Sequence, residues 1–528
     1  MRNSGLCNML IKSALILLTC ASSWSLKVQA ASEMVPGEFM KIGWSTTDIT
    51  PSQKVDLRGQ FPARVSEGVL DPVTATVLAI ESPEPSSNGQ ALIISCDLVA
   101  IDTEIVEAVR KKIKAVLNDF DTDHIIISAT HTHTAPLCGS FDNTISKYGI
   151  ELDVMAPSAY LDFMSNRIAS AAKEAWSNRK SGGISYGLGH AVVGHNRLMV
   201  SSSGKSVMYG NTNIPDFSHI EGYEDHSVNL LYTWDNQKNL TGVVVNIACP
   251  SQVTENLYQI SADYWHDTRV ELRERLGQNL YVLGQCSAAG DQSPHFLIGA
   301  KAETRMQKLM FPDSIQTGDR TSGLRKQIAI RIADAVTSVL PYMKDQIEWN
   351  PKIGYQMEKV ELSRRLIDIN DVNKALNQSK ERQAKYDQLL KEINDNPSIK
   401  QKRRWYTDIT NSYQRLSRGQ NVKARFELEK VQPKLPVEVN VLRIGEVAMA
   451  TNPFELYLDY GMRIKARSSA TQTFLVQLAN GSYGYLPPYR STMGGSYGAE
   501  PASTQVGPEG GQELVEKTLE MINELFKK

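Results

Sequence analysis

The alternation of apolar and polar residues between positions 91 and 130 predicts a strand, a helix and a second strand in succession. Residues 91–99 form an almost continuous apolar run, and residues 124–130 form another that is rich in isoleucine. Between them, apolar residues recur at intervals of three and four, as on one face of a helix: Ile105, Val106, Val109, Ile113 and Leu117. The short connections favour a parallel βαβ unit with a right-handed crossover.

Similar patterns recur farther along the chain. An apolar run at 241–248 leads into a polar loop, after which a helix capped by Asp263 extends to Leu276 and ends at Gly277. The later pattern predicts a strand at 280–284, a strand pair at 437–444 and 447–451, a strand at 473–478 and a helix at 513–527. These elements predict an α/β fold with a mixed, largely parallel sheet flanked by helices.

The character of the sequence changes between residues 365 and 430. Apolar residues at helical intervals lie among many charged residues on either side of Pro397, which predicts two amphipathic helices in an antiparallel hairpin. We interpret this segment as an insertion into one α/β domain made of residues 31–350 and 432–528. The hairpin is either a lid over a cleft or a solvated packing arm, and the sequence leaves both open.

The N-terminus has the pattern of a secretory signal peptide. Basic residues precede the apolar run 14–21, and Val28 and Ala30 supply the small residues of a cleavage site. We therefore expect residues 1–30 to be removed and the protein to be periplasmic or secreted. A lipid anchor at Cys20 is less favoured, because threonine is unusual before the cysteine of a lipoprotein signal. No other stretch is long and apolar enough to cross a membrane.

Composition narrows the possible partners. The chain has 528 residues with a formal net charge of −1, so bulk charge gives no reason to expect nucleic acid as a partner. Beyond residue 30 there are four cysteines, too few for a disulfide framework in a chain of this size: Cys96, Cys138, Cys249 and Cys286. A thiolate bound to a metal ion remains possible.

The strand at 124–130 runs into His131 and His133. If the strand continues through them, both imidazoles leave the same face, roughly 7 Å apart at Cα. They would also lie at the carboxyl end of a parallel strand, where open α/β sheets place their ligands. Histidine is the commonest metal ligand and a proton carrier at neutral pH, so the pair indicates a functional site.

Other strands also end in loops that carry reactive side chains. The strand at 280–284 precedes a loop with Ser293, and the strand at 447–451 precedes Glu455. Tyr485 and Tyr497 lie in glycine-rich segments near the C-terminus. An acidic residue and tyrosines are suitable for a zinc site and its oxyanion donors. The Ser293 loop is not the Gly-x-Ser-x-Gly elbow of α/β-hydrolases.

The order of these motifs resembles the neutral, non-lysosomal ceramidase family. The resemblance extends from about residue 40 to 500 and rests on motifs at 42–51, 127–136, 194–197, 246–263, 290–294, 453–455 and 484–485. It implies a mixed α/β catalytic domain that binds one zinc ion. By this resemblance His131, Glu455 and Tyr485 are zinc ligands. His133, Arg197 and Tyr497 surround the substrate carbonyl, and Ser293 lies beside the water bound to the metal. The implied reaction is hydrolysis of an amide or ester.

One departure from the family concerns the zinc ligands. The family has a ligating histidine after the strand that corresponds to 243–248, whereas this chain has Cys249 there. Cys249 can replace the histidine, since thiolate is a good zinc ligand. Alternatively, His266 turns toward the site, or the metal is absent. We favour Cys249 and a retained zinc.

A second departure concerns the substrate. The family carries a β-sandwich after the catalytic domain, whereas we expect none here, and no hydrophobic hairpin for bilayer insertion is evident. The expected substrate is therefore a small molecule or a lipid or glycan conjugate, with an esterified glycan as one alternative to ceramide. A metal-free binding protein and a hydrolase that uses Ser293 or Cys286 as nucleophile are the other classes left open.

Overall fold

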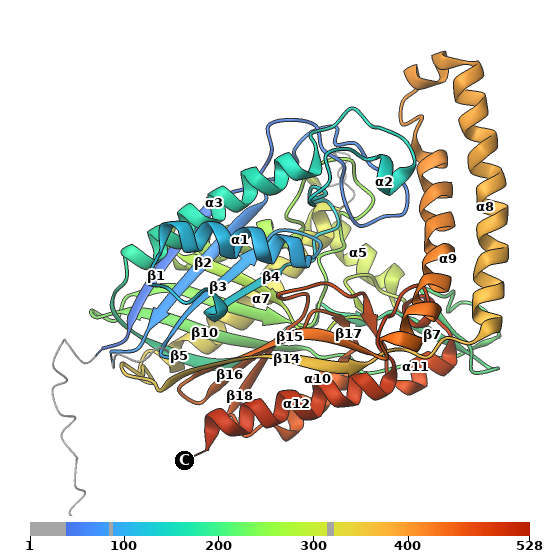
Figure 1. Cartoon of the computed structure of the whole chain (residues 1–528). Helices are drawn as coiled ribbons and strands as arrows, with labels where there is room; N and C mark the ends of the chain where they lie inside the picture. Colours follow the sequence, from blue (N-terminus) through green and yellow to red (C-terminus); the bar gives the residue numbers. More distant parts are fainter. Residues whose placement is uncertain (1–38, 84–87, 314–320, 528) are drawn as a thin grey trace, which may run out of the picture. The chain divides into compact units, whose positions relative to one another are not determined.

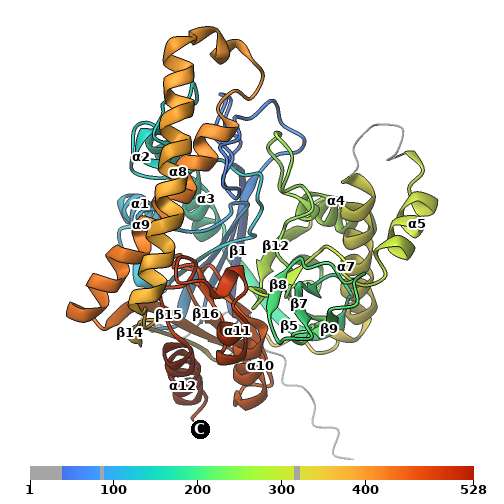
Figure 2. The ribbon, with the colours of Figure 1, turned by 90° about the vertical axis from the view of Figure 1, so that its right-hand side faces the viewer.

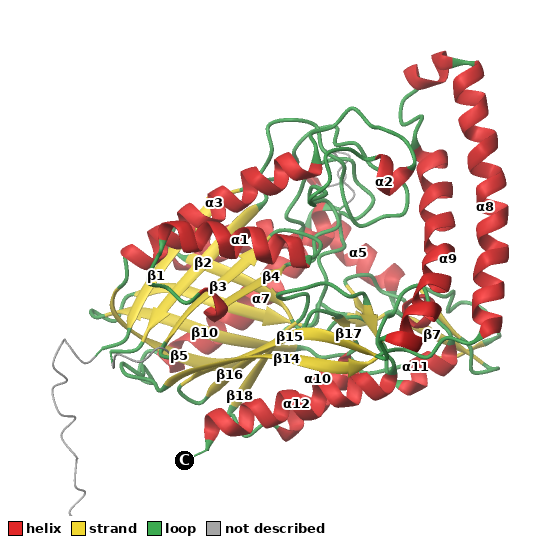
Figure 3. Cartoon of the chain, viewed as in Figure 1, coloured by secondary structure: helices red, strands yellow, loops and turns green. Residues whose placement is uncertain are grey.

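An eight-stranded sheet forms the centre of the fold (Figures 1 and 3). The computed structural model describes residues 39–83, 88–313 and 321–527, so the expected signal peptide lies outside the described residues. In sheet order the strands are β12 (Tyr281–Cys286), β11 (Leu240–Ile247), β10 (Ser227–Asp235), β5 (Lys180–His190), β1 (Lys41–Asp48), β2 (Thr74–Glu81), β3 (Gln90–Cys96) and β4 (Ile125–Ala129).

The mixed α/β class predicted from the sequence is confirmed. The pairs β3–β4 and β11–β12 are parallel, whereas the pairings between them are antiparallel. The parallel pairs therefore lie at the two ends of the sheet. These are also the pairs whose following loops carry the predicted site residues.

Helices cover the outer faces of the sheet. The βαβ helix α1 (Thr103–Val116) buries its apolar stripe and packs beside α3 (Pro157–Ser177), which contacts β1 and β2 (Figure 1). At the other end, α4 (Tyr264–Leu276) packs on α7 (Ser322–Met343), which contacts β5 and β10. The N-cap of α4 is Asp263, whose side chain accepts from Tyr264 N, as predicted.

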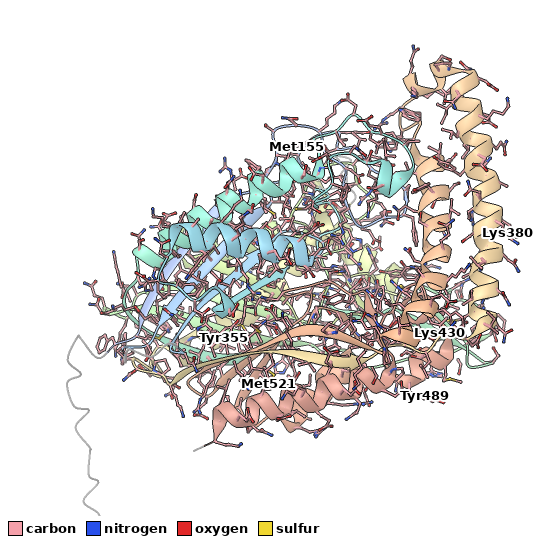
Figure 4. The ribbon with its side chains drawn as sticks, viewed as in Figure 1. Met155, Tyr355, Lys380, Lys430, Tyr489 and Met521 are labelled. Carbon is pink, nitrogen blue, oxygen red and sulfur yellow. The ribbon has the colours of Figure 1, made fainter. Side chains whose placement is uncertain are left out.

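A second sheet packs face to face with the first. Its strands are β14 (Ile353–Ser363), β15 (Lys434–Ile444), β16 (Val447–Thr451) and β18 (Gln472–Val476). Apolar residues of both sheets share one buried core, for example Leu283 with Phe474. The C-terminal helix α12 (Pro508–Phe526) covers this sheet on its outer side, next to α10 (Leu458–Arg467) (Figure 1). Met521 of α12 is fully buried, and Figure 4 shows it on this helix.

The segment that follows β18 joins the two ends of the large sheet. Asn480 N donates to Ile127 O of β4 at 3.0 Å, and Ala129 N donates to Leu478 O at 3.3 Å. On its other side, Gln477 N donates to Cys286 O of β12 at 3.1 Å. Residues 477–480 therefore bring the carboxyl ends of both parallel pairs to one place.

The predicted helical hairpin is also confirmed. It consists of α8 (Ile369–Asp395), a short η3 turn (Pro397–Gln401) and α9 (Thr407–Val431), and the two long helices lie side by side (Figures 1 and 2). Its outer face is polar, with exposed side chains such as Lys380 (Figure 4). The start of α9 packs against α2 (Ile145–Tyr148).

Short elements fill the loops. They are β6 (His195–Asn196), β7 (Leu198–Ser201), β8 (Ser206–Met208), β9 (Phe217–Ile220), β13 (Gln292–Ser293), β17 (Glu455–Leu456), β19 (Tyr485–Leu486), η2 (Thr122–His124), α5 (Ala300–Met310), α11 (Tyr489–Gly494) and η4 (Tyr497–Ala499). The four cysteines beyond residue 30 are free thiols. Within the described ranges, no helix has the length and apolar character needed to span a bilayer.

Candidate active site

A cavity of about 340 Å³ lies where β4, β11 and β16 end. Six of the eight predicted site residues line it: His131, His133, Arg197, Glu455, Tyr485 and Tyr497. They come from segments more than 350 residues apart in the sequence. The structure therefore brings most of the predicted constellation together.

The backbone at His131 turns sharply after β4. Its φ is 67°, in the left-handed region, so the strand ends at Ala129 and does not continue through the two histidines as the alternation predicted. His131 Nδ1 lies 2.6 Å from Val99 O. Because a carbonyl oxygen only accepts, Nδ1 carries a proton, and Nε2 is the nitrogen that faces the cavity.

Glu455 and Tyr485 lie side by side because β17 and β19 pair in parallel, with Glu455 opposite Tyr485. Glu455 Oε2 is 3.5 Å from His131 Nε2. Burial acts to raise the pKa of Glu455, but His131, Arg197 and Tyr485 together hold this pKa below its ordinary value. The carboxyl group is therefore an anion at neutral pH. Burial and the charge of Glu455 raise the pKa of Tyr485 well above its ordinary value.

These side chains provide donors that suit a zinc ion. In a tetrahedral site with bonds of about 2.0–2.1 Å, neighbouring ligand atoms lie about 3.3 Å apart. The distance of 3.5 Å between His131 Nε2 and Glu455 Oε2 is close to this spacing. Across the described ranges, no three His, Cys, Asp or Glu side chains are grouped to hold a metal ion. Tyr485, whose backbone pairs with that of Glu455, provides a further oxygen donor beside these two side chains.

His133 has a different environment from His131. Its Nε2 lies 2.9 Å from Gln252 Nε2 and 3.4 Å from His131 Nε2. The Gln252 amide is oriented by Arg197, whose Nη1 donates to Oε1 at 3.2 Å, so the amide nitrogen faces His133. His133 Nε2 is therefore an acceptor. Burial, followed by the charges of His131, Arg64 and Arg197, lowers the pKa of His133 well below its ordinary value.

Arg197 is buried at the base of the cavity. Its backbone is placed by a donation from Arg197 N to Asp291 O at 2.9 Å, next to the β6–β13 pair. Besides Gln252, the guanidinium donates to Gly290 O at 2.8 Å, to Tyr209 OH at 3.1 Å and to Tyr485 OH at 3.4 Å. It thus provides a fixed positive charge beside the His131–Glu455 pair.

Ser293 does not line the cavity but is hydrogen-bonded to a residue that does. It is fully buried in β13, and its Oγ accepts from Tyr209 OH at 3.2 Å and from His295 N at 3.1 Å. Tyr209 itself lines the cavity. Ser293 therefore contacts the site through this tyrosine.

The structure does not place Cys249 with the other predicted ligands. Val243, Val245, Ile247 and Cys249 share one face by the alternation of a strand, and this face packs into the core beneath α4 and α7. Cys249 Sγ donates to Val193 O at 3.4 Å, and burial raises the pKa of the thiol well above its ordinary value. The expectation that Cys249 replaces the missing histidine is thus corrected, because its side chain points away from the cavity.

The two remaining sequence-based candidates also lie outside the cavity. His266 is in the first turn of α4 and is not among the lining residues. Cys286 is fully buried, and burial raises its pKa to about 12. A nucleophilic role for Cys286 is not supported, since the thiolate is the reactive form.

Searches with the sequence alone match no family model and no curated protein. Solved structures that share the fold include two ceramidases. One is a neutral ceramidase from Pseudomonas aeruginosa, with 15% identity, a TM-score of 0.63, and coverage of 93% of this chain and 75% of that chain. The other, a ceramidase complexed with C2, has 14% identity, a TM-score of 0.61, and coverage of 92% and 75%. The fold is that of a neutral ceramidase.

Within this ceramidase fold, several cavity residues were not predicted from the sequence. They are Arg58, Phe61, Lys147, Tyr209, Gln252 and Glu255. Gln252 follows Cys249 by three residues, and its place in a polar loop after a buried strand was the one available signal. Lys147 lies in the short helix α2 and the others lie on loops, all without a recognisable motif, so only the tertiary structure reveals them.

Proposed function

We propose that the protein is a zinc-dependent hydrolase of the ceramidase type that cleaves an amide or ester bond. The observation that carries the proposal is the convergence of His131 Nε2 and Glu455 Oε2, 3.5 Å apart, in a cavity of a ceramidase fold. His131, Glu455 and Tyr485 would hold the ion. When bound, zinc supplies Lewis-acid polarisation of a carbonyl and lowers the pKa of water.

The surrounding side chains suit the remaining chemistry. Arg197 and the hydroxyl of Tyr497 present donors to the cavity, where negative charge on a carbonyl oxygen would develop. His133 is neutral, and its Nε2 accepts from the Gln252 amide beside His131, so in this proposal it is a polar contact for the substrate. Ser293 holds Tyr209 in place by a hydrogen bond. In this proposal Ser293 positions the site and is not a nucleophile.

A metal-free binding protein is the second candidate. A distance of 3.5 Å between His131 and Glu455 also satisfies a direct ion pair without a metal, which is the observation that favours this candidate. The N-terminal sequence pattern supports export in either case. The proposed substrate is a small molecule or a lipid or glycan conjugate.

Metal content separates the two candidates. We expect gently purified protein to contain about one equivalent of zinc, and His131→Ala and Glu455→Ala each to lose zinc and amide hydrolysis together. Cys249→Ala is the matched control and should retain both, since its thiol faces the core. Measurement is by elemental analysis and hydrolysis of N-acyl amides. Less than about a tenth of an equivalent of zinc in the native protein would contradict the proposal.

A further inference from the structure

Two cations that line the cavity, Arg197 and Lys147, form no ion pair with a described residue, and the guanidinium of Arg197 is already held by four neutral acceptors. Arg58 forms a two-bond ion pair with Asp102, with Nη2 3.1 Å from Oδ1. Glu255 lies 3.4 Å from His295 Nε2, and Glu455 pairs with His131. Lys147 also lines the cavity, and no ion pair joins it to another described residue.

Lys147 is held at the cavity wall by the helical hairpin. It lies in α2, and its backbone oxygen accepts from Gln414 Nε2 of α9 at 2.5 Å. The next carbonyl but one, Gly149 O, accepts from Tyr386 OH of α8 at 2.9 Å. Gln414 itself lines the cavity. The inserted hairpin therefore fixes the backbone that presents this lysine.

A second cation, Arg415 of α9, contacts a lining residue of the cavity without lining it itself. The guanidinium of Arg415 lies 4.5 Å from the ring centre of Phe61, which lines the cavity. Arg415 Nε donates to Asn411 Oδ1 at 3.0 Å, a neutral partner. Burial and the neighbouring Arg382 and Arg418 lower the pKa of Arg415, against the opposing effects of Tyr497 and Glu500.

A buried cation without a counter-ion costs free energy that an anionic ligand would recover. Lys147 is half-buried, and burial and the charge of Arg58 lower its pKa, although the carboxylates of Asp56 and Asp102 act in the opposite direction. Neither carboxylate forms an ion pair with Lys147, because Asp56 accepts from Tyr148 and Arg64, and Asp102 pairs with Arg58. The negative residues nearest the reacting centre are already paired. A negative group on a bound molecule is therefore the missing partner.

We propose that Lys147 forms a subsite for an anionic group of the substrate, namely a carboxylate, phosphate or sulfate. The description of this ligand as the substrate rests on the proposed function. The subsite lies where the hairpin meets the cavity, since Gln414 of α9 lines the cavity and donates to Lys147 O. It selects amides or esters with a negative charge outside the scissile bond.

Two pairs of amides test this inference by equilibrium binding to the full protein at low ionic strength. In the first pair, N-lauroylglycine carries a carboxylate on the amine side of its amide bond, and N-lauroylglycinamide is its neutral counterpart. In the second pair, N-dodecylsuccinamic acid carries a carboxylate on the acyl side, and its amide is the neutral counterpart. We expect the charged member of at least one pair to bind about tenfold more tightly, since ionised acceptors form the stronger hydrogen bonds with lysine. Lys147→Met should remove this preference, whereas Lys147→Arg should keep most of it.

Lys380→Met is the matched control. Lys380 is an exposed lysine of the same hairpin, so the preference should be unchanged in this variant (Figure 4). Equal or undetectable binding of both members in both pairs would overturn the inference, as would a preference that persists in Lys147→Met. Charge-selective binding without any hydrolysis would contradict the proposed function alone. Hydrolysis of both members without charge selectivity would contradict the inference alone.

Discussion

At the scale of single residues, Gln252 connects two predicted site residues that the sequence could not relate. Its amide oxygen accepts from Arg197 at 3.2 Å and its nitrogen lies 2.9 Å from His133 Nε2. One side chain thus fixes both the orientation of the guanidinium and the acceptor state of the imidazole. Such partners of reactive groups contribute to activity although they do not react themselves.

Replacing Gln252 tests this role. Gln252→Leu leaves a buried Arg197 Nη1 and His133 Nε2 without their amide partner, which costs about 1–3 kcal/mol for each group. We expect kcat/KM for an N-acyl amide to fall about 10- to 100-fold, with zinc retained. Gln285→Leu is the control, because Gln285 is a buried amide of β12 that does not line the cavity. Activity of Gln252→Leu within twofold of the native value would contradict the role.

At the scale of elements, the close packing of the two hairpin helices depends on Gly419. A Cβ at this position would lie 2.1 Å from Ser379 Oγ and 2.6 Å from Ala375 O, so only glycine lets α9 approach α8 this closely. The two helices bury Val372, Tyr386, Ile393, Ile409, Leu416 and Val422. Because the hairpin also fixes α2, its packing determines the position of one cavity wall.

Gly419→Val should force the helices apart. We expect the free energy of unfolding to decrease by about 1–3 kcal/mol, as is usual for overpacking. Urea unfolding followed by circular dichroism measures this change. Ala424→Val places the same final side chain at an exposed position of α9 and should change stability by less than about 0.5 kcal/mol. Equal stabilities of the two variants would show that the contact at Gly419 is not important.

At the scale of the whole molecule, Asp56 links distant parts of the chain and couples folding to pH. It is buried, accepts from Tyr148 OH of α2 at 2.7 Å and from Arg64 N at 3.0 Å. Burial raises its pKa to about 6, against the opposing effects of Tyr148, Arg64 and Lys147. Since the pKa rises on folding, the folded state binds more protons than the unfolded state between about pH 4 and 6.

The stability contributed by Asp56 is therefore present at low pH and is lost as the pH rises through about 6. A rise from 3.8 to about 6 corresponds to roughly 3 kcal/mol. Between pH 4 and 7, we expect the free energy of unfolding of the native protein to decrease by this amount relative to that of Asp56→Asn. Urea unfolding at each pH measures this change. Asp119→Asn, an exposed carboxyl on the loop before β4, should follow the native profile. Parallel pH profiles of Asp56→Asn and native protein would contradict the coupling.

The sequence by itself determined the local elements and the chemical types of the site. Apolar periodicity specified the βαβ unit, the capped helix α4 and the two hairpin helices, because these patterns depend on neighbours within a few residues. The alternation of side chains along β11 also predicts that Cys249 shares a face with Ile247. Motif order indicated which residues would meet in the cavity.

Only the tertiary structure decided how those residues meet. The two parallel ends of the sheet come together because residues 477–480 hydrogen-bond to both β4 and β12, and no local pattern specifies a contact between segments so distant in sequence. The same holds for the bridge through Gln252 and for the wall that presents Lys147. Side-chain direction in loops depends on packing against distant segments, so the chain had to fold before the surroundings of its reactive groups were fixed.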